Sequence, residues 1–103
     1  MTTFPPWHDQ LAELRYLAAK VARVHGLTHP DTAILSEVVA TFADCPRDDH
    51  LAHAALAGRI RVLTRDFQPW SEACGSVRQL YLGLAHVVNA VPGTARLAAD
   101  PGM

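Results

Sequence analysis

The sequence has little of what several protein classes require. It contains 2 cysteines among 103 residues, which is too few for a disulfide-stapled scaffold, and they form no CxxC pair, so we expect reduced thiols. Nine lysines and arginines stand against 10 aspartates and glutamates, so the basic excess of a dedicated nucleic-acid binder is missing. No apolar run approaches the length of a membrane span, and the first residues do not resemble a signal peptide. We therefore expect a cytoplasmic protein that binds neither nucleic acid nor membrane.

The residues that are present favour a helical globular domain. Half of them are hydrophobic and 18% are charged, which is ordinary for a folded soluble chain. Alanine is frequent and β-branched residues are spread thinly, and this composition favours helix over strand. The length predicts one domain. We expect it to cover residues 1–92 and to be followed by a flexible C-terminal tail at 93–103.

Four segments have the spacing of amphipathic helices. We expect them at about 6–25, 28–43 and 46–66, with a fourth that begins between 69 and 76 and ends before the "VPG" at 91–93. Thr28, Asp44 and Ser76 are the expected N-terminal caps. The apolar faces are expected to include Val24 in the first helix, and Leu51 and Val62 in the third. Leu27 is expected to pack back on the end of the first helix.

These helices predict an all-α, antiparallel up-down four-helix bundle, because short connections make consecutive helices antiparallel. The second helix is shorter than the first and fourth, so one wall of such a bundle leaves apolar surface uncovered. A large exposed apolar patch usually marks an interface. We therefore expect a homodimer to complete the bundle.

Histidines provide the main candidate metal site. His50 and His53 are three residues apart, close to one another on a helix surface, and His25 closes the first predicted helix. Imidazoles on facing helices suit iron or zinc. The other interpretation is that His25 is favoured by the helix dipole, and that His50 and His53 belong to a solvated face. Cys74, near the start of the fourth helix, could have a depressed thiol pKa, but we expect no redox role for it.

Two stretches resemble a known family. "AKVARVHGLTHPD" at 19–31 and "FQPWSEACGSVRQLYLGL" at 67–84 resemble parts of the hemerythrin-like di-iron proteins that repair damaged iron–sulfur clusters. The resemblance implies a hemerythrin-like fold. It also implies that His25 and His50 occupy positions of iron ligands in that family.

The carboxylates that such a di-iron site needs are scarce. The sequence has three glutamates, Glu13, Glu37 and Glu72, and none of them lies four residues after a histidine. Residues four apart on a helix point the same way, and bridging carboxylates of these sites come from such turns. We therefore expect no standard di-iron site within one chain.

Two functions remain open. The first, which we favour, is a non-catalytic relative of the repair family that acts by dimerisation or by binding a protein partner. The alternative is a histidine-ligated metal or cofactor-binding protein in iron handling or in the nitrosative or oxidative stress response. In that case His25, His50 and His53 would hold a single transition metal, iron or zinc.

Overall fold

The computed structural model describes residues 7–91, and of Trp7 and His8 only the backbone. Within this range the chain forms four helices and no strand: α1 (Trp7–His25), α2 (Asp31–Asp44), α3 (His50–Leu63) and α4 (Gly75–Asn89). The all-α prediction is therefore confirmed. None of these four helices is long and apolar enough to cross a membrane. The predicted tail at 93–103 lies outside the described residues.

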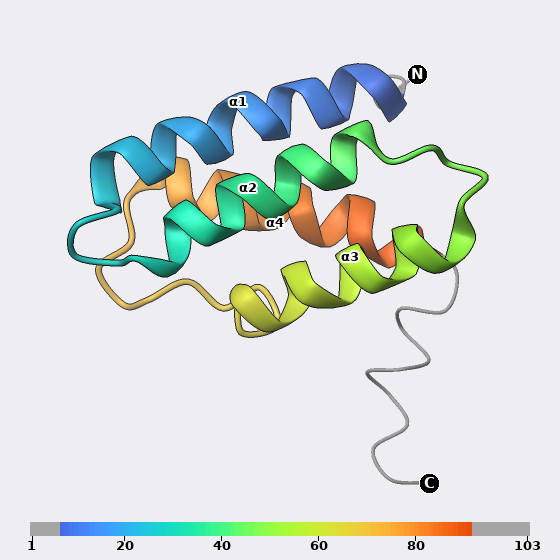
Figure 1. The fold of residues 1–103 in the computed structure, drawn as a ribbon. Helices are drawn as coiled ribbons and strands as arrows, with labels where there is room; N and C mark the ends of the chain where they lie inside the picture. The colour runs from blue at the N-terminus through green and yellow to red at the C-terminus, as the bar shows by residue number, and fades with distance from the viewer. Residues whose placement is uncertain (1–6, 92–103) are drawn as a thin grey trace, which may run out of the picture.

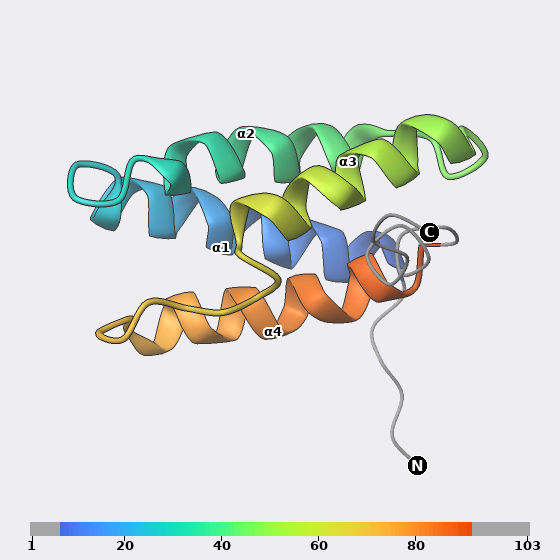
Figure 2. The same ribbon diagram turned by 90° about the horizontal axis from the view of Figure 1, so that it is seen from below.

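Each helix packs against two others. α1 contacts α2 and α4, and α3 contacts the same two helices. In Figure 1, α1 lies at the top and α3 at the bottom, with α2 and α4 between them. The view from below in Figure 2 separates α2 from α4. The core therefore lies where the inner faces of all four helices meet.

Apolar side chains from every helix fill this core. Phe42, Ile60 and Leu84 are each 0% exposed, and burial of a side chain of this size stabilises the fold by about 1.5–3 kcal/mol. The predicted apolar faces of the second and fourth helices are buried as expected; their members are Leu35, Val38, Val39, Phe42, Val77, Leu80, Tyr81, Leu84 and Val88.

The apolar face of α1 departs from the prediction at its end. Val24 is 65% exposed and Leu27 is 102% exposed, so neither packs as expected. The buried positions of this helix are Leu11, Leu14, Ala18 and Val21. Because these positions advance by three and four residues, the next inward position is His25 and not Val24. The helix thus ends with a histidine on its inner face.

The third helix is shorter than predicted at both ends. It begins at His50, because the Asp49 carboxylate accepts a hydrogen bond from the Ala52 backbone N–H and serves as the N-terminal cap in place of Asp44. It ends at Leu63. Its predicted apolar face is also wrong, since Leu51 is 87% exposed and Val62 is 76% exposed.

Candidate functional site

The three histidines predicted to bind metal are not gathered in one place. His25 is the last residue of α1, whereas His50 is the first residue of α3 and His53 follows one turn later. These helix ends lie at opposite ends of the molecule in Figures 1 and 2. Among the side chains that the structure describes, at 9–91, no three of histidine, cysteine, aspartate or glutamate form a group that could hold a metal ion. A metal site that includes His25 therefore remains a prediction.

His53 belongs to the core. It is 5% exposed, and its ring stacks on Phe42 with the centroids 4.6 Å apart and the planes at 16°. Burial lowers the pKa of His53, and the positive charges of Arg47 and His50 lower it further, while Asp49 acts in the opposite direction. The solvated-face interpretation is wrong for this residue. It holds for His50, which is exposed.

A cysteine and a histidine meet at the other end of the molecule. The Nε2 atom of His25 lies 3.3 Å from the Sγ atom of Cys74. Cys74 is exposed and occupies the N-cap position of α4. His25 reaches Cys74 because its ring lies on the inner face of α1, at the last residue of that helix. The two residues are 49 positions apart in the sequence, so the contact depends on the packing of α1 beside α4.

This environment favours the thiolate form of Cys74. The pKa of its thiol falls to about 7, first because the backbone N–H of Val77 donates to the sulfur and then because of the hydrogen bond with His25. Desolvation opposes the shift, and the Ser76 backbone N–H adds to it. A cysteine at a helix N-terminus beside a histidine is the arrangement that activates thiols. The thiolate fraction of Cys74 at neutral pH is therefore much larger than that of an unperturbed cysteine.

The second cysteine lies in a contrasting environment. Cys45 directly follows α2, and its pKa is raised by desolvation and by the carboxylates of Asp49 and Asp48. The same chain thus contains one activated thiol and one deactivated thiol. Cys45 is a built-in reference for any measurement of Cys74 reactivity.

Two aromatic rings lie beside His25, those of His29 and Trp70. Trp70 stacks on His29 with the ring centroids 3.9 Å apart and the planes at 16°. The edge of the His25 ring meets Trp70 at 5.6 Å between centroids. His29 precedes α2 and Trp70 belongs to the segment between α3 and α4. The stack therefore ties two connections of the chain together next to the thiol.

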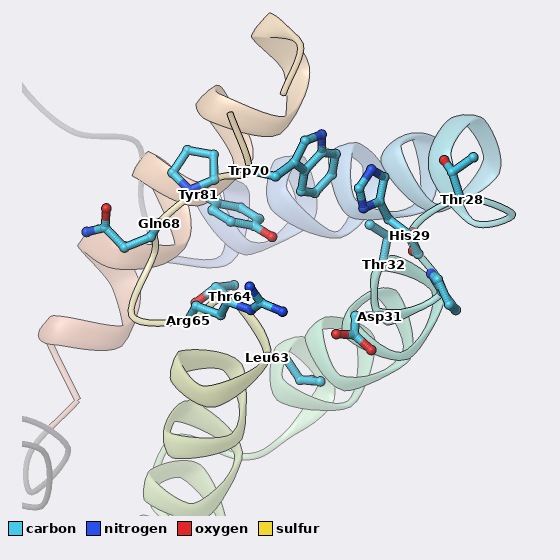
Figure 3. A pocket seen from close by; sticks show the side chains of 12 residues that line it. Thr28, His29, Asp31, Thr32, Leu63, Thr64, Arg65, Gln68, Trp70 and Tyr81 are labelled. Atoms are coloured by element: carbon cyan, nitrogen blue, oxygen red, sulfur yellow. The ribbon is translucent and has the colours of Figure 1, made fainter. Parts of the chain in front are cut away.

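A pocket of about 480 Å³ is lined in part by His29 and Trp70, the two residues of this stack. Its walls come from the start of α2, the end of α3, the segment before α4, and Tyr81 on α4. In Figure 3 the Tyr81 hydroxyl, the Arg65 guanidinium and the Asp31 carboxylate face the same space beside His29 and Trp70. The volume is in the range of small-molecule sites.

The turn that follows α3, which places Arg65 at the wall of this pocket, has an unusual backbone conformation. Arg65, Asp66 and Phe67 follow one another with φ values of 53°, 58° and 64°, a left-handed conformation that costs non-glycine residues about 1–2 kcal/mol each. The buried hydroxyl of Thr64 supports the turn by donating to the Ile60 carbonyl at 2.9 Å and accepting from the Phe67 N–H at 3.1 Å.

Arg61 braces the same turn from α3. Its guanidinium donates to the Asp66 carboxylate at 2.5 Å and to the Asn89 side chain at 2.6 Å. It also lies over the Phe67 ring, 5.2 Å from the centroid. The left-handed turn is therefore held by side chains on both of the helices that it joins.

Sequence reasoning found parts of this site but not the whole. It placed Cys74 near a helix start and singled out His25, yet it assigned no reactivity to the thiol. It did not place Trp70, Arg65 or Tyr81 around a pocket. The available signal was the position of Cys74 immediately before a helix that begins with glycine and serine.

Comparison of the chain with protein-family models, with curated proteins and with solved structures finds no match. The site is therefore interpreted from its own geometry.

Proposed function

We propose that this protein is a small helical thiol protein whose reactive group is the Cys74 thiolate. The observation that carries the proposal is the 3.3 Å contact between His25 Nε2 and Cys74 Sγ at the N-terminus of α4. The thiolate is the nucleophilic form of cysteine, and the exposed position of Cys74 leaves it open to thiol-directed oxidants and electrophiles. Such a protein responds to redox conditions through one residue.

The rate of alkylation by iodoacetamide as a function of pH tests this proposal. In a Cys45→Ser background we expect the rate at Cys74 to rise with a midpoint near pH 7. His25→Ala should move that midpoint upward, because a hydrogen bond to the thiolate is lost while the Val77 and Ser76 N–H groups remain. His50→Ala, at the other end of the molecule, should leave it unchanged. A Cys74 midpoint equal to that of Cys45, measured separately in a Cys74→Ser variant, would refute the proposal.

A second proposal concerns partners. We propose that the chain is a hemerythrin-like antiparallel bundle that forms a homodimer or binds a protein partner without catalysis. The packing of each helix on two others is consistent with this arrangement. Three outward apolar side chains favour a partner, since Leu51 is 87%, Val62 is 76% and Leu82 is 75% exposed. A solution mass equal to one chain at micromolar concentration, with no captured partner, would contradict it.

The metal-binding alternative is tested with the same protein. A single iron or zinc would be held by His25, now with Cys74 in reach as a soft ligand. Metal analysis of untagged protein should then give a stoichiometric metal that His25→Ala removes. The exposed His50 would have to contribute from a second chain, so His50→Ala would lower the metal content of a dimer only, and the buried His53 could join it only if its ring left the core.

A further inference from the structure

The pocket beside the Cys74–His25 pair contains a polar group that the fold leaves without a hydrogen bond. Tyr81 is 6% exposed, and its hydroxyl faces the pocket in Figure 3. Among the side chains described at 9–91 and the backbone of 7–91, it has no hydrogen-bond partner. The Tyr81 hydroxyl oxygen is not among the enclosed side-chain polar atoms that lack a partner, so it is accessible from the pocket and a ligand can bond it.

Charges of both signs border the same space. The Asp31 carboxylate and the Arg65 guanidinium line the pocket, and both act on Tyr81, where Asp31 raises the pKa of the phenol and Arg65 lowers it, after the larger effect of burial. Carboxylate ligands pair with arginine, and ammonium groups pair with aspartate. A ligand that carries both a carboxylate and an ammonium group therefore matches this pocket.

The backbone conformation of Arg65 also supports a ligand site at this pocket. Arg65 is exposed and adopts a φ of 53°, where an arginine is strained and a glycine is not. Backbone strain that persists in a fold is concentrated at functional sites. Holding Arg65 in this conformation sets its guanidinium at the pocket mouth.

The Cys74 thiol has no disulfide partner within its own chain. Cys45 follows the last residue of α2, and Cys74 contacts His25 near the first turn of that helix. The 14 residues of α2 span roughly 20 Å, whereas a disulfide requires Cα atoms within about 7 Å. Any disulfide formed by Cys74 must therefore join it to another molecule.

Resting on the proposed thiolate function, we propose that the pocket binds a low-molecular-weight disulfide of the zwitterionic amino-acid or short-peptide class and delivers it to Cys74. The Cys74 thiolate attacks one sulfur of the disulfide. A mixed disulfide with Cys74 forms, the original S–S bond breaks, and the second half leaves as a free thiolate. No other oxidant is needed, because the disulfide itself is reduced.

The geometry suits a ligand of that length. Tyr81 lies seven residues beyond Cys74 along α4, which corresponds to roughly 10 Å. Three extended residues span about 10 Å. A short peptide joined to Cys74 through its cysteine can therefore reach Tyr81, which lines the same pocket as Arg65, Asp31 and Trp70.

Mixed-disulfide formation, followed by intact-protein mass spectrometry in the Cys45→Ser background, tests the proposal. The probes are glutathione disulfide, which is zwitterionic, cystamine, which carries only ammonium groups, and uncharged 2-hydroxyethyl disulfide. We expect glutathione disulfide to react at least tenfold faster than 2-hydroxyethyl disulfide. Arg65→Gly should abolish that preference without slowing the uncharged probe, and Tyr81→Phe should reduce it severalfold.

The outcomes separate this proposal from the one on which it rests. If Cys74 reacts rapidly with all three disulfides and Arg65→Gly changes none of the rates, the pocket proposal fails while thiolate reactivity stands. If Cys74 reacts with none of them faster than Cys45 does in a Cys74→Ser variant, the proposed function itself fails. Arg65→Gly suits the test because its φ is comfortable for glycine, so a loss of preference does not reflect unfolding.

Discussion

Substitution by alanine should change the free energy of unfolding differently at the helical glycines Gly58 and Gly83. An added Cβ at Gly58, in α3, would meet no atom within 4 Å. An added Cβ at Gly83, in α4, would lie 2.5 Å from the Cδ2 atom of Leu14 in α1. Leu14 is itself 5% exposed, so a shift of its side chain to make room would disturb a packed position. Gly83 therefore permits the close approach of α1 and α4.

The magnitudes follow from two opposing terms. Replacing glycine by alanine inside a helix stabilises it by about 0.8–1.0 kcal/mol, and Gly58→Ala should gain that full amount. At Gly83 the same gain is opposed by overpacking, which costs about 1–3 kcal/mol. Gly83→Ala should therefore be neutral or destabilising by up to about 2 kcal/mol, which leaves a difference of about 1–3 kcal/mol between the variants.

Urea unfolding followed by circular dichroism measures both variants, and thermal scans should differ by about 4–8 °C for each kcal/mol in a domain of this size. A Leu14→Ala background provides the control, because it removes the clashing atom and should restore the gain from Gly83→Ala. If Gly83→Ala stabilises the protein as much as Gly58→Ala does, α1 and α4 do not pack through Leu14.

Three further changes test the turn and the core. Thr64→Val should destabilise the protein by about 1–3 kcal/mol, because the Phe67 N–H loses its acceptor, and a smaller loss by urea unfolding would contradict the supporting role of the Thr64 hydroxyl. Arg65→Gly should stabilise it by up to about 1 kcal/mol through relief of the left-handed backbone, whereas a net loss would mean that the turn is unstrained. The pKa of His53 is below its unfolded value of 6.5, so its contribution to stability is complete above about pH 6.5 and is lost as the pH falls through the folded pKa. His53→Leu should flatten the decline in unfolding free energy between pH 7 and 5, and an unchanged slope would be inconsistent with this assignment.

The helices could be predicted because their cores follow the helical period. Leu35, Val38, Val39 and Phe42 recur at three and four residues, and all four are buried. The helix ends could not be predicted in the same way, because the periodic pattern does not specify which residue caps a helix. Asp44 and Asp49 are equally suitable caps by residue type, and the structure uses Asp49.

The turn after α3 is the clearest failure of sequence reasoning. A left-handed turn is expected at glycine or asparagine, and the segment from Arg65 to Phe67 contains neither residue. What stabilises it comes from elsewhere, through the Thr64 hydroxyl and the Arg61 guanidinium. Aspartate tolerates the left-handed region, but Asp66 alone does not predict three consecutive left-handed residues.

The candidate site was predictable only in pieces. The location of Cys74 at a helix start follows from the sequence, and so does the end of α1 at His25. Their contact does not, because it depends on how far α1 and α4 overlap. The pocket requires four separated segments to meet, and periodicity within one segment carries no information about that meeting.

The single guanidinium of Arg61 links the strained turn to the last residue of α4. It donates to Asp66 and to Asn89, so the same side chain holds both the turn that contains Arg65 and the end of α4. Coupling between two places is reciprocal in free energy. A molecule that rigidifies the turn should therefore also steady the end of α4.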